Sequence, residues 1–147
     1  MWVTLYSDAS FRTKGGWGIW LRSEKGRIVK SGECPDSVSD SAAAEMFAAL
    51  MGIEVCLQNW DETKGIQVNA DCLMVVNGLY PWSKPIQRKS IRVIQDKIKA
   101  LLKEKNVRVR CKHVKGHSGT GNTRSWLNDQ VDKLAGQHSK DSRNQQF

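Results

Sequence analysis

The chain has 147 residues, of which 39% are hydrophobic and 26% are charged. This composition is typical of a globular domain with its own core, and the length is too short for two comfortable domains. Lysine and arginine together number 23 against 15 acidic residues, and the resulting net charge of +8 favours a polyanionic partner such as nucleic acid without proving one.

The chain carries no sign of a membrane or secretory address. We find no run of about 18 apolar residues, so we expect no membrane span. The first twenty residues include Asp8, Arg12 and Lys14 and no apolar stretch of the signal-peptide kind. The four cysteines are scattered, with no pair at zinc-site or redox-motif spacing, as in proteins of a reducing compartment. These features together predict a cytoplasmic protein.

Three β-strands are predicted at the start of the chain. Residues 2–8, 17–23 and 27–33 are rich in residues that favour strands. The turns between them contain Lys14-Gly15-Gly16 and Lys25-Gly26, which are typical turn sequences. The three strands should therefore form an antiparallel meander.

The rest of the chain alternates predicted helices and strands. Apolar residues recur there at helical spacing, and Pro81 and Pro85 separate a short helix from a long one. In chain order we expect a helix over 41–59, a strand over 66–70, a short helix up to about Leu79, a helix over 86–104, a strand over 107–113, a Gly-rich loop over 116–123 and a last helix that begins near Ser125. Strands that follow a helical crossover add in parallel, so the order predicts an α/β fold with one mixed sheet.

Four carboxylates occupy unusual positions in this arrangement. Asp8 and Asp71 end two strands that should be neighbours, and ligands of open α/β sheets bind at the carboxyl ends of strands. Glu45 lies on the first long helix, on a face that continues through small residues instead of solvated charges. Asp132 lies on the last helix, four residues after Asn128 and on the same side.

Such a cluster favours hard divalent cations. Converging carboxylates repel one another unless a cation neutralises them, and a set of oxygen ligands suits Mg²⁺ or Mn²⁺ instead of Zn²⁺. Two such ions about 4 Å apart would hold the attacking and leaving oxygens of a phosphodiester. Each acid alone also has an ordinary explanation: a turn former for Asp8, a first-turn helix acid for Glu45, a helix cap for Asp71 and a solvated residue for Asp132. Only the joint pattern favours a metal site.

Five short motifs occur in order on these predicted elements. They are Tyr6-Ser7-Asp8-Ala9-Ser10, Ala44-Glu45-Met46-Phe47-Ala48, Asn69-Ala70-Asp71, Val114-Lys115-Gly116-His117-Ser118-Gly119 and Asn128-Asp129-Gln130-Val131-Asp132-Lys133-Leu134-Ala135. Each motif alone is weak, but five in order over residues 2–137 are specific. The chain resembles type 1 ribonuclease H, including the retroviral RNase H domain.

The resemblance implies a fold, a reaction and a set of site residues. The fold is a five-stranded mixed sheet in spatial order 3-2-1-4-5, with strands 1–3 antiparallel and helices on its faces. The reaction is endonucleolytic cleavage of the RNA strand of RNA–DNA hybrids with two Mg²⁺ ions, for which Mn²⁺ can substitute, leaving 5′-phosphate and 3′-hydroxyl ends. By position, the resemblance assigns catalysis and metal binding to Asp8, Glu45, Asp71 and Asp132, and it matches His117 to a loop histidine associated with proton movement or product release.

Two of these assignments have alternatives. His117 could instead be a solvent-exposed loop side chain without a role. Asp129 is a rival to Asp132, because the preceding loop shifts the register. The Val-Asp-Lys-Leu-Ala context around Asp132 matches the family, which favours Asp132.

The chain departs from the family pattern where the substrate would be held. Asp40 and Ser41 replace a common Thr-Asn pair, and an acid at the threonine position is at odds with a DNA-phosphate pocket found in some relatives. Cys72 and Leu73 follow Asp71 where the family has Ser-Gln, so a polar substrate contact is missing there. The phosphate pocket could be replaced by basic residues nearby.

The means of gripping a duplex is also different. The chain has no room for the inserted basic helix and loop that many members carry. Residues 84–105 contain eight lysines and arginines against two acids, so the helix there either tracks a phosphate backbone or is a solvated face. Trp82 either packs against the DNA strand or is a core or rim aromatic. The candidate substrate contacts are Ser10, Arg12, Lys14, Ser41, Cys72 and Trp82.

Three functions remain possible at this point. A hybrid-specific endoribonuclease is favoured over a different nuclease of the same superfold, such as a junction resolvase, and over a hybrid-binding module without activity. We expect residues 1–138 to form the catalytic domain and residues 139–147 to be a polar, disordered tail. We also expect a monomer that binds an RNA–DNA hybrid duplex and no membrane.

Overall fold

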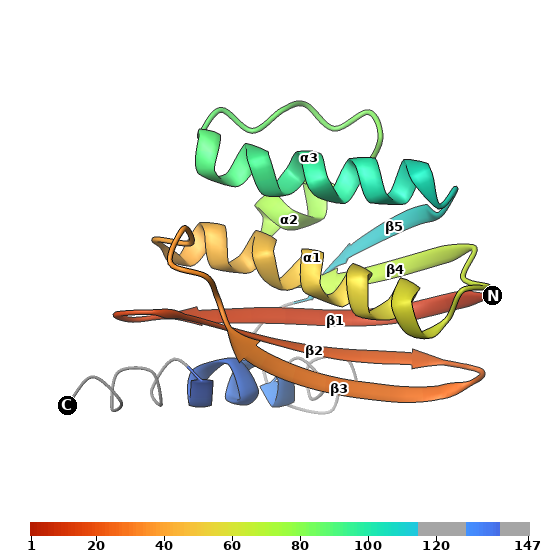
Figure 1. The fold of residues 1–147 in the computed structure, drawn as a ribbon, viewed down its shortest axis with the longest axis horizontal. Helices are drawn as coiled ribbons and strands as arrows, with labels where there is room; N and C mark the ends of the chain where they lie inside the picture. Colours follow the sequence, from red (N-terminus) through yellow and green to blue (C-terminus); the bar gives the residue numbers. More distant parts are fainter. Residues whose placement is uncertain (115–128, 139–147) are drawn as a thin grey trace.

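The fold is an α/β sandwich built on one five-stranded mixed sheet (Figure 1). This computed structural model describes residues 1–114 and 129–138. The elements are β1 (Trp2–Phe11), β2 (Gly15–Ser23), β3 (Gly26–Glu33), α1 (Ser41–Asn59), β4 (Gly65–Ala70), α2 (Leu73–Gly78), α3 (Lys89–Glu104) and β5 (Arg108–His113), and residues 129–138 are helical. The strand order is β3-β2-β1-β4-β5, with β1 to β3 antiparallel and β4 and β5 parallel to β1. The predicted sheet and its order are therefore confirmed.

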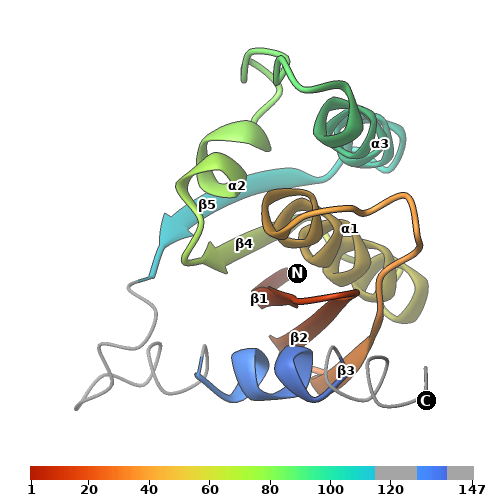
Figure 2. The same ribbon diagram turned by 90° about the vertical axis from the view of Figure 1, so that its left-hand side faces the viewer.

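The helices lie on both faces of the sheet (Figure 2). Helices α1, α2 and α3 cover one face, where α1 packs on β1 and β2 and α2 packs on β4 and β5. The helix over 129–138 lies on the opposite face. A small second core forms there from Tyr6, Val114 and Val131, with Trp20 packed against it. The sheet is thus buried on both sides near the carboxyl end of β1.

Strand β1 is longer than predicted, and this changes the position of Asp8. The prediction ended the strand at Asp8, but β1 continues to Phe11 because it pairs with β2 as far as Phe11 and Gly15. The parallel pairing with β4 stops earlier, at Tyr6 and Asn69. Asp8 therefore lies within β1, just beyond the point at which β1 and β4 stop pairing. The local sequence does not mark this extension, because the backbone hydrogen bonds that sustain it come from β2.

The connection between α2 and α3 is organised by a buried glutamine. Gln95 lies on α3 and is fully buried. Its Nε2 donates hydrogen bonds to the carbonyls of Gly78 at 2.9 Å and Lys84 at 3.0 Å, and its Oε1 accepts one from Ile86 N at 2.9 Å. Because residue 86 is held in this way, α3 begins at Lys89 and not at residue 86 as predicted.

Helix α1 is long and apolar enough, by length and composition alone, to cross a membrane, although Glu45 and Glu54 interrupt its apolar residues. However, ten of its residues are buried in the fold. A core helix packed between a sheet and another helix is apolar for that reason, and α1 contacts β1, β2 and α3.

The small-residue face of α1 permits close approach to β1. Gly52 on this face lies against Leu5 of β1, and a Cβ atom added at Gly52 would lie 2.5 Å from Leu5 Cδ1. Leu5 is fully buried and has no room to retreat. The predicted role of this face is therefore confirmed, and the contact fixes the height of α1 above the sheet.

We expect Gly52→Val to destabilise the protein by about 1 to 3 kcal/mol, because the added atoms overpack the α1–β1 contact. Urea denaturation followed by circular dichroism would measure the change. Gly136→Ala is the matched control, since a Cβ there meets no atom within 4 Å. That control should be neutral or slightly stabilising, and an equal loss in both variants would contradict the packing explanation.

Candidate active site

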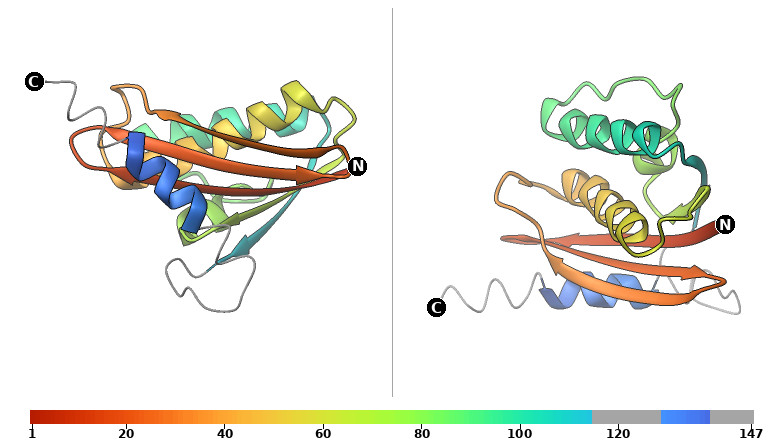
Figure 3. Two further views of the ribbon diagram at one scale, coloured as in Figure 1. Left: turned by 90° about the horizontal axis from the view of Figure 1, so that it is seen from below. Right: turned by 45° about the vertical axis from the view of Figure 1, so that its right-hand side comes forward.

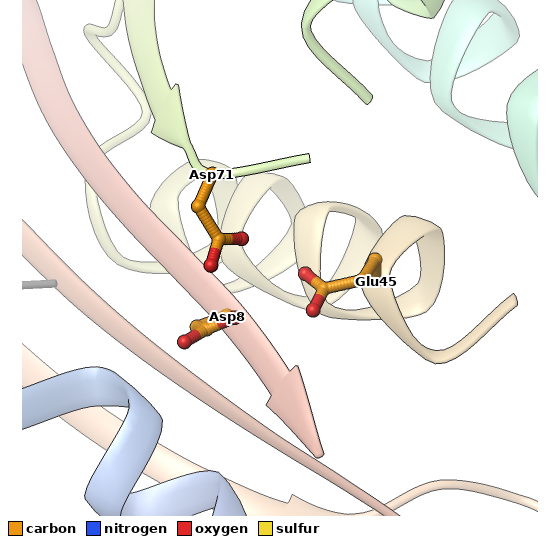
Figure 4. Close-up of side chains that lie close together, drawn as sticks. All are labelled: Asp8, Glu45 and Asp71. Atoms are coloured by element: carbon orange, nitrogen blue, oxygen red, sulfur yellow. The ribbon is translucent and has the colours of Figure 1, made fainter. Parts of the chain in front are cut away.

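Three carboxylates from three elements converge at the carboxyl edge of β1 and β4 (Figure 4). Asp8 comes from β1, Glu45 from α1, and Asp71 from the residue after β4. One oxygen atom from each lies within 4.8 Å of the others. The parallel pairing of β1 with β4 brings Asp8 and Asp71 to the same edge, and the close packing of α1 brings Glu45 over it. The predicted convergence of these three acids is confirmed.

Hydrogen bonds hold the backbone around this cluster. The buried side chain of Asn69 donates from Nδ2 to the carbonyl of Leu5 at 3.2 Å and so ties β4 to β1. Ala9 N donates to Asp8 Oδ1 at 2.9 Å and fixes that carboxylate. His113, at the end of β5, contacts the carbonyl of Asp71 through Nε2 at 3.0 Å. The carboxylates are therefore held on a rigid frame.

Burial and mutual repulsion raise the pKa values of two of these acids. Asp8 is only 2% exposed, and burial raises its pKa to about 11, with the charges of Glu45, Asp71 and Asp132 adding to the shift. Burial also raises the pKa of Glu45 to about 8, and the charge of Asp71 contributes. Acids exposed on a protein surface keep pKa values of about 4. The raised values of Asp8 and Glu45 are those expected of carboxylates that are shielded from water and that no positive charge neutralises.

The cluster fits a divalent cation. Among the residues that the structure describes, the buried oxygens Asp8 Oδ2 and Glu45 Oε2 have no hydrogen-bond donor. Buried polar atoms are almost always satisfied, so two orphaned oxygens in one cluster indicate an absent partner. The donors are all carboxylate oxygens, which is the ligand set that Mg²⁺ and Mn²⁺ prefer.

Asp132 lies close to this cluster but outside its tight centre. It is half-buried on the helix over 129–138, and it is among the acids whose charge raises the pKa of Asp8. The rival residue Asp129 lies on the same helix and is also half-buried. His117 lies outside the described residues, as does most of the loop before this helix.

The predicted substrate contacts near the β1–β2 hairpin are placed around the site. Ser10 is half-buried on β1, Ser41 is exposed as the first residue of α1, and Arg12 is exposed in the turn after β1. The Lys14 ammonium lies 3.3 Å from a Glu33 carboxylate oxygen and 3.5 Å from one of Asp36. Both carboxylates raise the pKa of Lys14. Lys14 is therefore partly neutralised within the protein, whereas Arg12 is exposed to solvent.

The predicted contacts after β4 differ in exposure. Cys72 is half-buried at the start of α2 and makes no side-chain capping bond. Trp82 is 76% exposed, which decides against a core position. Its ring stacks on Tyr80, with ring centroids 4.7 Å apart and planes 11° from parallel. The Tyr80 hydroxyl in turn accepts a hydrogen bond from Cys111 N at 2.9 Å. The exposed ring of Trp82 therefore stacks on a tyrosine ring that β5 holds in place.

The unusual acid Asp40 has a structural role in the fold. It caps α1, accepting a hydrogen bond on Oδ1 from Ala43 N at 2.9 Å. Its other carboxylate oxygen forms an ion pair with Arg88, just before α3. Asp40 thus connects the starts of two helices.

Part of the basic charge around α3 is used within the fold. Arg88 pairs with Asp40, Arg92 Nη1 donates to the Gln87 carbonyl at 3.0 Å, and Lys99 donates to the Ser83 carbonyl. Three of the eight cations in this stretch therefore tether the connection that precedes α3. The other five cations of this stretch are exposed to solvent. They could contact a phosphate backbone or form a solvated helix face.

Two residues position the site in ways that only the strand pairing shows. The contact of His113 with Asp71 follows from the β4–β5 register, which pairs Ala70 with His113. Asn69 belongs to the motif Asn69-Ala70-Asp71, but only its hydrogen bond to Leu5 shows its role. Both signals depend on pairing between strands that are far apart in the sequence.

The RNase H family model matches residues 2–140 of the chain. The chain belongs to the RNase H family. Ribonuclease H of Prochlorococcus marinus strain NATL1A is 28% identical over 134 residues, which cover 86% of this chain and 78% of that protein. Ribonuclease H of strain NATL2A matches to the same extent. The protein is therefore a homologue of ribonuclease H enzymes, and it carries the carboxylate cluster of Asp8, Glu45 and Asp71.

Solved RNase H structures share the fold. The N-terminal RNase H domain of a Mycobacterium tuberculosis protein has a TM-score of 0.78 at 14% identity and covers 99% of both chains. LC11-RNase H1 in complex with an RNA/DNA hybrid has a TM-score of 0.77 at 15% identity, covering 95% of this chain and 98% of that one. RNase H1 of Halobacterium salinarum NRC-1 has a TM-score of 0.72 at 20% identity, covering 96% and 99%. At these identities the likeness shows the fold alone.

The raised pKa values make the metal-free protein sensitive to pH. Asp8 and Glu45 have ordinary pKa values of 3.8 and 4.5, so the folded state keeps protons that the unfolded state releases. The stability that these protons provide is complete below about pH 4 and is lost as the pH rises toward the folded values. We expect the urea midpoint in EDTA to fall between about pH 5 and about pH 9.

The variant Asp8→Asn should be more stable than the parent at neutral pH in EDTA, and its midpoint should depend less on pH. Added Mg²⁺ should raise the midpoint of the parent and have less effect on the variant. A parent midpoint that is flat over this range, or that rises with pH, would contradict the assigned repulsion.

Proposed function

We propose that this RNase H family protein is an endoribonuclease that hydrolyses the RNA strand of RNA–DNA hybrids. The observation that carries the proposal is the cluster of buried Asp8 with half-buried Glu45 and Asp71, in which one oxygen of each lies within 4.8 Å of the others and two buried oxygens lack donors. The family match and the curated relatives named Ribonuclease H support the reaction class. The hybrid in the LC11-RNase H1 structure supports the substrate.

The same carboxylates are the proposed metal ligands. Asp8, Glu45, Asp71 and Asp132 would hold two Mg²⁺ ions, with Mn²⁺ able to substitute. When bound, two such ions activate a water molecule and stabilise the leaving oxygen of a phosphodiester. The expected products carry 5′-phosphate and 3′-hydroxyl ends.

The chain holds the carboxylates in place before a metal binds and shields them partly from water. Asp8 is fixed by Ala9 N, and the backbone at Asp71 is fixed by His113, so the site needs little rearrangement when it is loaded. Burial of Asp8 and Glu45 lowers the local dielectric and strengthens their attraction for a cation. His117 is proposed to assist proton movement or product release, and it lies outside the described residues.

Substrate recognition is proposed to involve side chains around the cluster. Hybrids are distinguished from DNA duplexes by 2′-hydroxyl contacts in a shallow minor groove. Ser10, Ser41 and the backbone near Cys72 are the proposed contacts of this kind. Trp82 would pack against the DNA strand, and Arg12, with a lesser contribution from Lys14, would contact phosphates. We further propose a monomer that acts in the cytoplasm and away from membranes.

The substitution Asp71→Asn tests the reaction. With an end-labelled RNA–DNA hybrid and Mg²⁺, we expect the parent protein to cut only the RNA strand. The variant should lose at least about 100-fold in rate, because even changes in residues around metal ligands cost roughly 10- to 100-fold. Gel electrophoresis of the products would measure both rates and would identify the ends.

The control Asp61→Asn removes an exposed acid of the α1–β4 loop and should leave the rate unchanged. Matched RNA and DNA duplexes and a branched DNA substrate complete the assay. Cutting of the branched DNA but not the hybrid would replace this proposal by a resolvase. Hybrid binding without cutting in either Mg²⁺ or Mn²⁺ would show a binding module.

The exposed Trp82 offers a separate test of the grip. Trp82→Ala should weaken hybrid binding by about 1 to 3 kcal/mol, as expected for loss of an aromatic contact with a nucleic-acid strand. KM for the hybrid should rise while the unfolding midpoint stays constant, because the side chain is 76% exposed. Val93→Ala, at an exposed apolar residue of α3, is the control and should change neither quantity. An unchanged KM in the Trp82 variant would remove this residue from the substrate site.

A further inference from the structure

The face of the sheet opposite α1 carries a row of polar side chains that crosses all five strands. The register aligns Arg27, Arg22, Thr4, Gln67 and Arg110 in that order from β3 to β5. Partnered residues project from the same side of a sheet, so these five side chains share one face. With neighbouring strands about 4.8 Å apart, the row is about 19 Å long.

This face is strongly basic. Arg108 and Lys112 flank Arg110 on β5 and project from the same side, and all five cations are exposed. None of them forms an ion pair with another described residue. The row contains no carboxylate, and neither does the adjacent row of Val29, Trp20, Tyr6, Asn69 and Lys112. We call the surface formed by Arg22, Arg27, Arg108, Arg110, Lys112 and Trp2 the basic sheet face.

Two of the arginines are held over indole rings. The Arg27 guanidinium lies 5.6 Å from the ring centroid of Trp20, and that of Arg110 lies 5.2 Å from the ring centroid of Trp2. Trp2 is itself placed tightly, since a Cβ on Gly65 would lie 2.4 Å from its ring. Trp2 nevertheless remains 46% exposed, and Val29 is 42% exposed. The face therefore combines ordered guanidinium groups with accessible apolar surface.

The basic sheet face is separate from the catalytic carboxylates. Trp2 and Asp8 project from the same side of β1, but they are six residues or about 20 Å apart along the strand. The helix over 129–138 covers this face at the level of Asp8, where Val131 packs on Gly18, the β2 partner of Asp8. Figure 3 shows this helix crossing β1 and β2 at the end away from the N-terminus. A nucleic-acid strand bound on the basic sheet face would thus lie beside the catalytic carboxylates and not over them.

We propose that the basic sheet face binds single-stranded nucleic acid, namely an unpaired strand that flanks the hybrid. The choice of nucleic acid over other polyanions rests on the proposed function. A row of donors across a twisted sheet suits a flexible strand, which can follow the twist, whereas a rigid duplex cannot. The arginines at both ends would bind phosphates, and half-buried Thr4 and Gln67 would contact sugar or base edges. Bases can stack on both aromatic rings and guanidinium planes.

The triple variant Arg22→Gln/Arg27→Gln/Arg110→Gln tests this surface. Fluorescence anisotropy would measure binding of a labelled 15-residue oligodeoxythymidine between about 50 and 200 mM salt. We expect affinity to fall at least about tenfold at the lowest salt, and the slope of log K against log salt to decrease in magnitude by about 2, at roughly 0.7 per lost phosphate contact. Cutting of a short blunt hybrid should be unchanged.

A second triple variant, Lys97→Gln/Lys103→Gln/Lys105→Gln around α3, is the matched control with the same change in net charge. It should bind the oligonucleotide within twofold of the parent. Unfolding midpoints would confirm that both variants are folded. If the parent does not cut the hybrid but the two triple variants still differ in affinity for the oligonucleotide, the proposed function fails and this inference stands.

Three results would overturn the inference. An equal loss of affinity in both triple variants would show a general charge effect. An unchanged affinity in the first variant would show that the strand binds elsewhere. Binding by the parent to phosphatidylserine vesicles but not to the oligonucleotide would assign the face to a membrane surface instead.

Discussion

The repulsion among carboxylates at the edge of β1 and β4 is the constraint on which the rest of the structure depends. Asp8 is buried there beside half-buried Glu45 and Asp71, and one buried oxygen each of Asp8 and Glu45 has no donor in the described structure. An unfolded chain would keep these like charges apart, so the free energy that offsets their repulsion must come from packing in the rest of the fold. The sheet and helix α1 provide it, because the packing of α1 on β1 and β2 buries a large apolar area.

The local design of the frame follows from this requirement. Asn69 ties β4 to β1, Ala9 fixes Asp8, and His113 contacts the backbone of Asp71. Gly52 lets α1 approach closely enough for Glu45 to reach the edge. Such a frame trades stability for affinity, since the charges that weaken the metal-free fold are those that attract a cation. This exchange is characteristic of functional sites in otherwise well-packed proteins.

The short connection between α2 and α3 shows how the fold can dispense with an inserted basic helix. Gln95 satisfies three backbone groups of this connection from the core side, and the Asp40–Arg88 ion pair links its end to α1. Trp82 emerges from the same segment on the anchored ring of Tyr80. Asp40 and Trp82 are thus parts of one local arrangement, in which charge serves tertiary contacts as well as any substrate.

The sequence by itself determined the order of the elements, the mixed sheet and the three converging acids. Helix α1 was predicted with the observed bounds because its apolar spacing is a local property, and Asp8, Glu45 and Asp71 lie in motifs that can be recognised without contacts. Tertiary structure alone decided the end of β1, the ion pair of Asp40 with Arg88, the role of Gln95 and the exposure of Trp82. It also decided the alignment of Arg22, Arg27 and Arg110, which are distant in sequence. These features arise from strand register and from packing between distant segments, and no local pattern in the chain encodes either.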